Sequence, residues 1–200
     1  LGKDHPDMAY SLDSLAQLYH LQGKYLEAES FYKRALDIFE KALGTDHSET
    51  PTIINNLAVL YLAQGKYEEA ELLHKRTLEI HEKTRGKDHL ETATSLNNLA
   101  LLYRSQGRYA EAESFYKRAL EIYEKAVGKN HPDTATIINN LGDLQRLQGK
   151  YEEAESHLKR ALEVRERVLG NDHPYTAQTS NNLGAVYRDQ EKFAEAEPLY

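Results

Sequence analysis

The chain has 200 residues, 25 basic and 32 acidic side chains that leave a net charge of −7 at pH 7, and no cysteine. The negative charge argues against a general nucleic-acid binder, and the lack of cysteine excludes disulfides, thiolate zinc sites and cysteine nucleophiles. No apolar run approaches the ~18 residues of a membrane span and no signal-peptide core is present, so we expect a cytoplasmic protein without a nucleic-acid or membrane partner.

An internal repeat of 42 residues organises the whole chain. We therefore expect a single array over 1–200, divided into repeats 1–42, 43–84, 85–126, 127–168 and a partial repeat 169–200. The residues that recur at this spacing include Gly2, Gly44, Gly86, Gly128 and Gly170, and also His5, His47, His89, His131 and His173.

The first element expected in each repeat is an amphipathic helix, called helix A here. In the first repeat, apolar residues fall at i, i+3, i+4 and i+7, which is the stripe of a helix with one buried face. Pro6 suits the first turn of this helix, and Gly23 suits the left-handed residue that ends it. The buried stripe consists of Leu12, Leu15, Ala16 and Tyr19.

The second element is a helix from about Tyr25 to Leu43, called helix B. Each repeat is then an antiparallel helix pair, which cannot bury its apolar face alone, so neighbouring pairs are expected to stack into an all-α solenoid. The buried side of helix B consists of Ala28, Phe31, Tyr32, Ala35, Leu36 and Phe39.

These residues resemble the tetratricopeptide repeat, in which helix A, a tight turn and helix B form a unit of about 34 residues. The longer repeat here, with NNLAVLY, QGKYEEAE and the linker LGxDHP, is similar to the kinesin light chain type, and the similarity covers essentially the whole chain. The resemblance implies a right-handed superhelical solenoid that acts as a non-catalytic protein-binding scaffold. It also implies that the side of helix A opposite the buried stripe lines a concave groove.

Paired asparagines recur on that opposite side. With Ala9 as position 1 of its repeat, position 6 holds Ser14, Asn56, Asn98, Asn140 and Asn182, and position 5 holds Asp13, Asn55, Asn97, Asn139 and Asn181. Asparagine is a poor helix-interior residue, so its recurrence needs a reason. One interpretation is a ladder of carboxamides that grips the backbone of an extended peptide. The other is that one amide of each pair bonds the neighbouring repeat and stabilises stacking.

Position 12 holds arginine in the last three repeats, at Arg104, Arg146 and Arg188. The planar guanidinium binds both oxygens of a carboxylate, so this row predicts capture of an acidic partner. A solvated charged face is the alternative, and Asp143 and Asp189 on the same face would neutralise part of the row.

The resemblance to kinesin light chains that bind acidic, Trp-containing peptides carries over to four residues by motif. They are Arg104 in LLYRSQG, Asn140 in INNLG, Arg165 in LEVRE and Asn182 in SNNLG. The pattern also has a lysine at position 2, where this chain has Thr136. At position 9, Val59, Leu101 and Ala185 would supply an apolar floor for an anchor side chain.

Catalytic and metal-binding motifs are missing from the sequence. There is no P-loop, GxGxxG, GxSxG or HExxH, and we expect no enzyme activity, cofactor or metal site. The linker histidines of stacked repeats lie too far apart to share an ion, since helices pack about 8–10 Å apart and metal–nitrogen bonds are about 2 Å long. We expect these histidines to order the linker and the start of helix A.

Two residues break the repeat pattern. Gln145 stands where the other repeats have a core tyrosine, and Glu191 stands where they have the turn glycine. A left-handed conformation at Glu191 would cost about 1 kcal/mol relative to glycine.

The sequence therefore favours a scaffold that binds an extended, acidic, aromatic-anchored peptide through the Asn ladder and the Arg row. A structural array that associates end to end with further copies, and a spacer module of a larger signalling protein, remain the alternatives.

Overall fold

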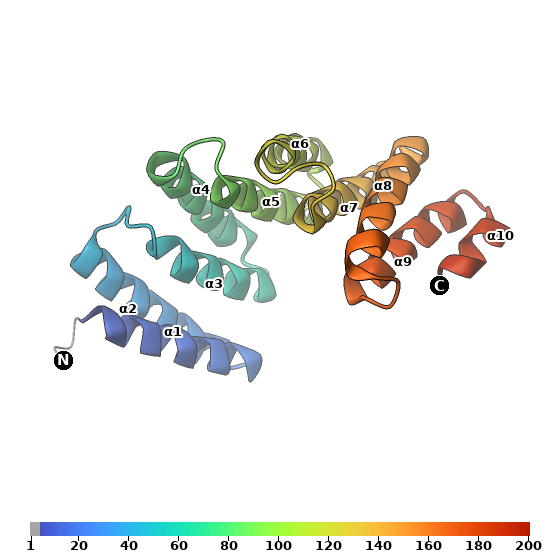
Figure 1. Ribbon diagram of the computed structural model, residues 1–200. Coiled ribbons are helices and arrows are strands. Elements are labelled where there is room, and N and C mark those ends of the chain that lie inside the picture. The colour runs from blue at the N-terminus through green and yellow to red at the C-terminus, as the bar shows by residue number, and fades with distance from the viewer. Residues whose placement is uncertain (1–4) are drawn as a thin grey trace. The chain divides into compact units, whose positions relative to one another are not determined.

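A computed structural model describes residues 5–200, and all regular elements in that range are helices (Figure 1). Gly2, used above to define the repeat, lies outside the described residues. The helices are α1 (Pro6–Leu21), α2 (Tyr25–Leu43), α3 (Thr50–Ala63), α4 (Tyr67–Thr84), α5 (Leu90–Ser105), α6 (Tyr109–Ala126), α7 (Pro132–Leu147), α8 (Tyr151–Leu169), α9 (Pro174–Asp189), α10 (Phe193–Ala196) and the 3₁₀ turn η1 (Glu197–Leu199). None of these helices is long and apolar enough to cross a membrane.

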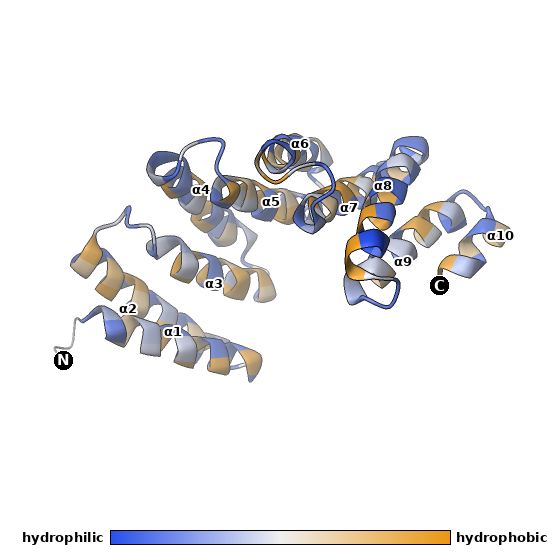
Figure 2. Cartoon of the chain, viewed as in Figure 1, coloured by the Kyte–Doolittle hydropathy of each residue, from blue (hydrophilic) through white to orange (hydrophobic). Residues whose placement is uncertain are grey.

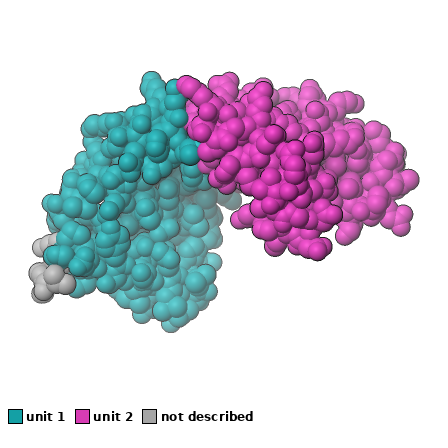
Figure 3. All heavy atoms as spheres, viewed as in Figure 1, with its two compact units in different colours: residues 1–102 teal, residues 103–200 magenta. Residues whose placement is uncertain are grey.

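The chain divides into two compact units, residues 1–102 and residues 103–200 (Figure 3). In compact unit 1, helix A packs on helix B in the pairs α1–α2 and α3–α4, and α2 packs on α3. In compact unit 2, the same arrangement holds for α7–α8 and for α8 against α9. The predicted all-α fold of stacked helix pairs is therefore confirmed.

The apolar stripes predicted from the sequence form the core of each unit. In compact unit 1, Leu12, Ala16, Ala28 and Tyr32 belong to one buried cluster, and Tyr19 packs against it half-buried. Apolar and hydrophilic residues accordingly alternate around each helix (Figure 2). In compact unit 2, two clusters of the same kind form between α7 and α8 and between α8, α9 and α10.

A tight turn joins helix A to helix B in the way the sequence predicts. Gly23 has φ 73°. The N–H of Gly23 donates to the carbonyl of His20, and the N–H of Lys24 donates to the carbonyl of Tyr19, both at 2.9 Å. This is the Schellman arrangement, in which a left-handed residue satisfies the last carbonyls of a helix. At the equivalent place in the fifth repeat, Glu191 has φ 61°, so the expected left-handed non-glycine residue is present.

The linker histidines cap helix A. Nδ1 of His5 accepts the N–H of Asp7 at 3.2 Å, and His131 accepts the N–H of Asp133 at the same distance. In both cases the histidine is the N-cap residue and a proline follows it. The side-chain acceptor satisfies one of the N–H groups that a helix start leaves unpaired. His89 and His173 make the same bond, so the prediction that these histidines order the start of helix A is confirmed for four repeats. His47 accepts the N–H of Glu49, which lies before α3, and α3 has no side-chain cap.

In two of the repeats, a glutamate on helix B forms an ion pair with a lysine in the turn of the next helix pair. Glu113 on α6 accepts from Lys117 on its own helix at 2.7 Å and from Lys150, in the turn before α8, at 2.9 Å. These two hydrogen bonds hold the pKa of Glu113 at about 2, below its usual value. Glu29 makes the equivalent contacts in compact unit 1, with Lys33 at 2.6 Å and Lys66 at 3.0 Å. The contacts join residues 37 positions apart and help to fix the stacking of adjacent repeats.

Because Glu191 holds a left-handed conformation, Glu191→Gly is expected to stabilise the fold by about 1 kcal/mol. The matched reverse change, Gly149→Glu at the same turn of the fourth repeat, should destabilise it by a similar amount. An added Cβ at Gly149 meets no atom within 4 Å, so backbone strain alone is tested. Urea unfolding of both variants checks the prediction, and equal stabilities would contradict it.

His74 on α4 makes compact unit 1 sensitive to acid. The side chain is 3% exposed, its Nδ1 has no hydrogen-bond partner, and burial lowers its pKa from 6.5 to about 4. The unfolded chain therefore binds the proton more tightly, so stability is complete above pH 6.5 and falls as the pH drops toward 4, by up to about 3 kcal/mol.

The variant His74→Leu, which places the residue of the fourth repeat (Leu158) at this position, should lose that dependence. Thermal unfolding midpoints at pH 7 and pH 5 measure it. The variant is expected to show a clearly smaller drop than the parent chain, and an equal drop would show that His74 is not the acid-sensitive group.

Candidate functional site

The helix A side of compact unit 2 carries a continuous ladder of ion pairs. Arg104, at the end of α5, pairs with Asp143 on α7. Asp143 also accepts from Arg146 at 3.0 Å, and Arg146 reaches Asp189 on α9 at 2.7 Å. Arg188 then donates to the same Asp189 at 3.0 Å and is exposed at the end of the ladder. The three arginines of position 12 thus share two carboxylates.

These pairs hold Asp189 in its ionised form. Burial by itself would raise the pKa of Asp189, but hydrogen bonds from Arg146 and Arg188 outweigh burial and lower it. The predicted row of arginines is therefore present on one face, and Asp143 and Asp189 neutralise part of it as the sequence suggested. Three cations and two anions leave one positive charge over the ladder.

The asparagines of positions 5 and 6 bond across neighbouring repeats. Asn182 on α9 donates through Nδ2 to Oδ1 of Asn139 on α7 at 3.0 Å. In compact unit 1, Asn56 on α3 donates in the same way to Asp13 on α1 at 2.8 Å. The position 6 amide of one repeat thus binds the position 5 oxygen of the repeat before it, which is the stacking role that the sequence left as an alternative.

The other predicted asparagines are half-buried on the same registers. Asn140 on α7 accepts from Nδ2 of Asn139 at 3.4 Å, a long hydrogen bond. Asn98 on α5 is half-buried, while Oδ1 of Asn55, at position 5 of the repeat before it, is buried without a partner. The ladder of amide hydrogen bonds is therefore interrupted at Oδ1 of Asn55.

Arg165 lies inside the unit rather than on its surface. The side chain is 1% exposed and donates to the carbonyl of Tyr175 at 2.7 Å, to Oγ1 of Thr179 at 2.5 Å and to Oγ1 of Thr136 at 3.0 Å. Its Nε has no hydrogen-bond partner. The exposed ring of Tyr175 covers the guanidinium, with 5.4 Å between the ring centre and Cζ of Arg165.

All three hydrogen-bond partners of Arg165 are neutral, and no carboxylate pairs with it within residues 5–200. Burial accordingly lowers the pKa of the guanidinium. A buried charge without a counterion costs several kcal/mol, so this residue differs from the ladder arginines, each of which has a carboxylate.

A signal that sequence reasoning missed lies in the partner of Arg165. His81 and Arg165 occupy the same place in helix B of their repeats, and both are polar. The residue that follows 14 places later in the chain, Ser95 or Thr179, is polar as well. His81 bonds Ser95 at 2.8 Å, and Arg165 bonds Thr179. Where helix B has Phe39, the residue 14 positions later is Ile53, and both are buried. The helix B residue and the residue 14 places later are thus both polar or both apolar in these repeats. This pairing in the sequence would have predicted their contact.

The described residues hold no group of three or more His, Cys, Asp or Glu side chains that could bind a metal ion.

Sequence profiles described as tetratricopeptide repeat match almost the whole chain. One profile matches residues 49–125, 91–167 and 133–200, and a second matches residues 8–49. A comparison with curated proteins gave no match.

Solved structures with the same fold include two of related repeat type. BtubC (BKLC) from P. vanneervenii has a TM-score of 0.84 and 29% identity, over 97% of this chain and 77% of that one. The Q17M form of a Podosopora anserina protein, described as "putative kinesin light chain nearly identical TPR-like repeats", has a TM-score of 0.82 and 25% identity, over 98% of this chain and 92% of that one. The apo form of RapI, at 16% identity and a TM-score of 0.71 over 99% and 82%, shares the fold alone.

The ladder predicts a large effect for a change at its centre. Asp143→Asn leaves Arg104 and Arg146 without their shared carboxylate, so we expect a loss of about 2 kcal/mol in unfolding free energy. Asp172→Asn, an exposed linker position, is the matched control and should change stability by less than about 0.5 kcal/mol. Urea titrations of the two variants test this, and equal midpoints would show that the ladder does not stabilise the fold.

Proposed function

Because the chain belongs to the tetratricopeptide repeat family, whose repeats generally build non-enzymatic protein-interaction scaffolds, we propose that it binds an extended acidic peptide along helix A of its repeats. An aromatic residue of the peptide provides the anchor. The binding site that we propose lies in compact unit 2 and includes Arg104, Asn140, Arg165 and Asn182. The array acts as one scaffold over residues 1–200 in the cytoplasm, without cofactor or metal.

The observation that carries this proposal is the uncompensated positive charge near α7 and α9. The chain as a whole has a net charge of −7, yet the arginine ladder has one more cation than it has anions. Arg165 adds a second cation without a carboxylate. A local surplus of arginine is what capture of partner carboxylates requires.

Arg165 becomes the central contact when Tyr175 moves. The Tyr175 side chain is 57% exposed, so its rotation needs little repacking. A partner carboxylate then reaches the guanidinium and accepts from Nε, the group that has no partner in the free protein. The side-chain amides of Asn140 and Asn182 lie on the neighbouring register, where they bind the peptide backbone.

The apolar floor comes from position 9. In compact unit 2 this floor is supplied by Ala185 on α9, which is half-buried. In compact unit 1 the same register holds Val59 and Leu101, which are 49% and 39% exposed and lie outside the site proposed here. Exposed apolar side chains beside polar ones are typical of the places where an anchor residue is buried in a complex. This arrangement favours a peptide with an aromatic side chain between its acids.

The test is a fluorescence-anisotropy titration with a labelled peptide that holds one tryptophan between acidic residues. Saturable binding is expected, with weaker affinity at physiological than at low salt because the attraction is between charges. Arg165→Gln should weaken binding at least about tenfold, which corresponds to about 1.4 kcal/mol.

Arg167→Gln is the matched control, since Arg167 lies two residues further along α8 with its side chain 52% exposed. It should leave the affinity within about twofold of the parent chain. Thermal unfolding of both variants separates lost binding from lost folding. No saturation by the parent chain, or equal affinity of a folded Arg165→Gln variant, would contradict the proposal.

Association of several copies is a second candidate function, favoured by exposed apolar residues on the first helix pair. Leu21 and Leu26, on α1 and α2, are 87% and 79% exposed, and Leu18 is 51% exposed. Such residues suit end-to-end contact with another copy. Sedimentation at several concentrations distinguishes the two: a mass that rises with concentration supports self-association, and a constant monomer mass removes it.

A further inference from the structure

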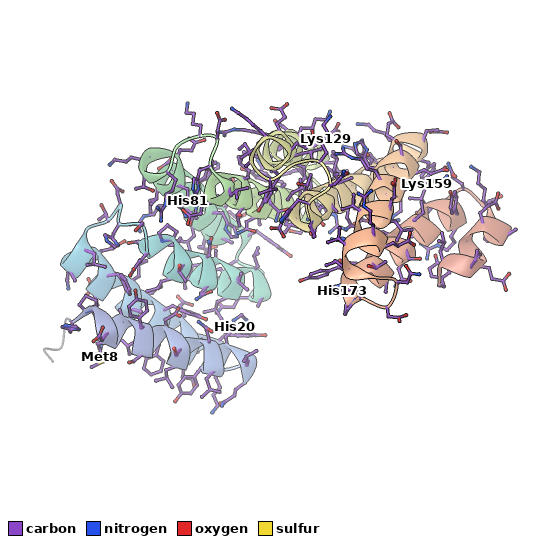
Figure 4. The ribbon with its side chains drawn as sticks, in the orientation of Figure 1. Met8, His20, His81, Lys129, Lys159 and His173 are labelled. Carbon is purple, nitrogen blue, oxygen red and sulfur yellow. The ribbon has the colours of Figure 1, made fainter. Side chains whose placement is uncertain are left out.

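A small pocket lies between α1 and α3 in compact unit 1. Its volume is about 190 Å³, and it is lined by Gln17, His20, Leu21, Tyr32, Asn56 and Val59. His20, at the C-terminal end of α1, is labelled in Figure 4 beside the end of α3. Pockets for whole small molecules have volumes of about 300–1,000 Å³, so this one suits a single side chain.

A buried carboxylate lies next to this pocket. Asp13 on α1 is 8% exposed. Its Oδ2 accepts from Nε2 of Gln17 at 2.7 Å, and its Oδ1 accepts from Nδ2 of Asn56 at 2.8 Å. Both donors are neutral amides, and no cation within residues 5–200 pairs with Asp13. The charge is therefore hydrogen-bonded but has no counterion.

Asp13 also determines the polarity of the pocket. The side-chain NH2 groups of Gln17 and Asn56 both donate to the carboxylate of Asp13. The side-chain carbonyl oxygen of each amide is therefore the atom that can accept a hydrogen bond from a ligand. Two oxygens are thus offered, next to a negative charge. Burial and, after it, the charge of Asp13 raise the pKa of Tyr32 to about 12, so the field of Asp13 reaches the pocket wall.

We propose that this pocket is a subsite for a basic side chain, lysine or arginine, of the bound peptide. The aliphatic stem lies against Leu21, Tyr32 and Val59, and the charged end donates to the two amide oxygens above Asp13. Basic side chains combine such a stem with a tip that only donates, so their chemistry matches both parts of the pocket.

The charge is particular to the first repeat. Position 5 holds asparagine in the other four repeats, at Asn55, Asn97, Asn139 and Asn181. The substitution Asp13→Asn therefore introduces the residue that this register otherwise uses and keeps its shape, so the variant is expected to fold. The control is Asp37→Asn on α2, which removes the same charge from a side chain that is 56% exposed.

The subsite rests on the proposed function because it, too, requires a peptide bound along helix A of the repeats. The subsite lies in compact unit 1 and takes a basic side chain, whereas the proposed function concerns an acidic peptide in compact unit 2. Either proposal can therefore fail without the other. The probe is a short peptide with blocked ends and one lysine among neutral residues, compared with the same peptide carrying norleucine in place of lysine. NMR signals of the Gln17 and Asn56 side-chain amides report on the pocket itself.

The lysine peptide should shift both amide signals in a saturable way, with at least about tenfold higher affinity than the norleucine peptide. Asp13→Asn should remove that preference, while Asp37→Asn keeps it. Equal binding of the two peptides, no shift at millimolar peptide, or an unchanged preference in the Asp13→Asn variant would each overturn the subsite. The acidic peptide, titrated in parallel, tests compact unit 2: its affinity should not respond to Asp13→Asn, and its failure alone would contradict only the proposed function.

Discussion

The contact between one helix pair and the next is the constraint on which this protein depends. A single pair leaves half of its apolar surface in water, so each repeat must present a face that fits its neighbour. The buried clusters supply most of the stabilisation, but they are non-directional and do not by themselves fix the register of one pair on the next. Polar contacts repeated at about 37 and 43 residues provide that register, through Glu29 and Lys66 and through Asp13 and Asn56.

This use of polar groups changes how the helix A side is interpreted. An arginine row and an asparagine ladder look like a binding surface when the sequence is considered alone. In the structure, most of these groups already have partners in the neighbouring repeat, as with Arg146 and Asp189. What distinguishes Arg165 and Asp13 is that each is buried, hydrogen-bonded to neutral groups and without a counterion among residues 5–200. Since buried unpaired charges are costly, these two are the positions where a charged partner would gain most.

Much of the fold could be predicted from the sequence because its signals are local and repeated five times. The turn glycines, the histidine caps and the left-handed Glu191 each depend on residues within a few positions. The site could be predicted only in part, because it depends on which residues of different repeats meet. Helical spacing placed Asp143 and Asp189 on the arginine face, but the burial of Arg165 depends on Thr136 and Thr179, 29 and 14 residues away.

We propose that a buried charge without a counterion among the described residues marks the place where a partner binds, and Arg165 offers the most direct test. Its Nε–H group can be followed by ¹⁵N–¹H NMR while the acidic peptide is added. This signal is expected to move to lower field and to saturate with the peptide, because an unpaired donor gains a carboxylate acceptor. Saturable peptide binding that leaves the Arg165 Nε–H signal unchanged would contradict it.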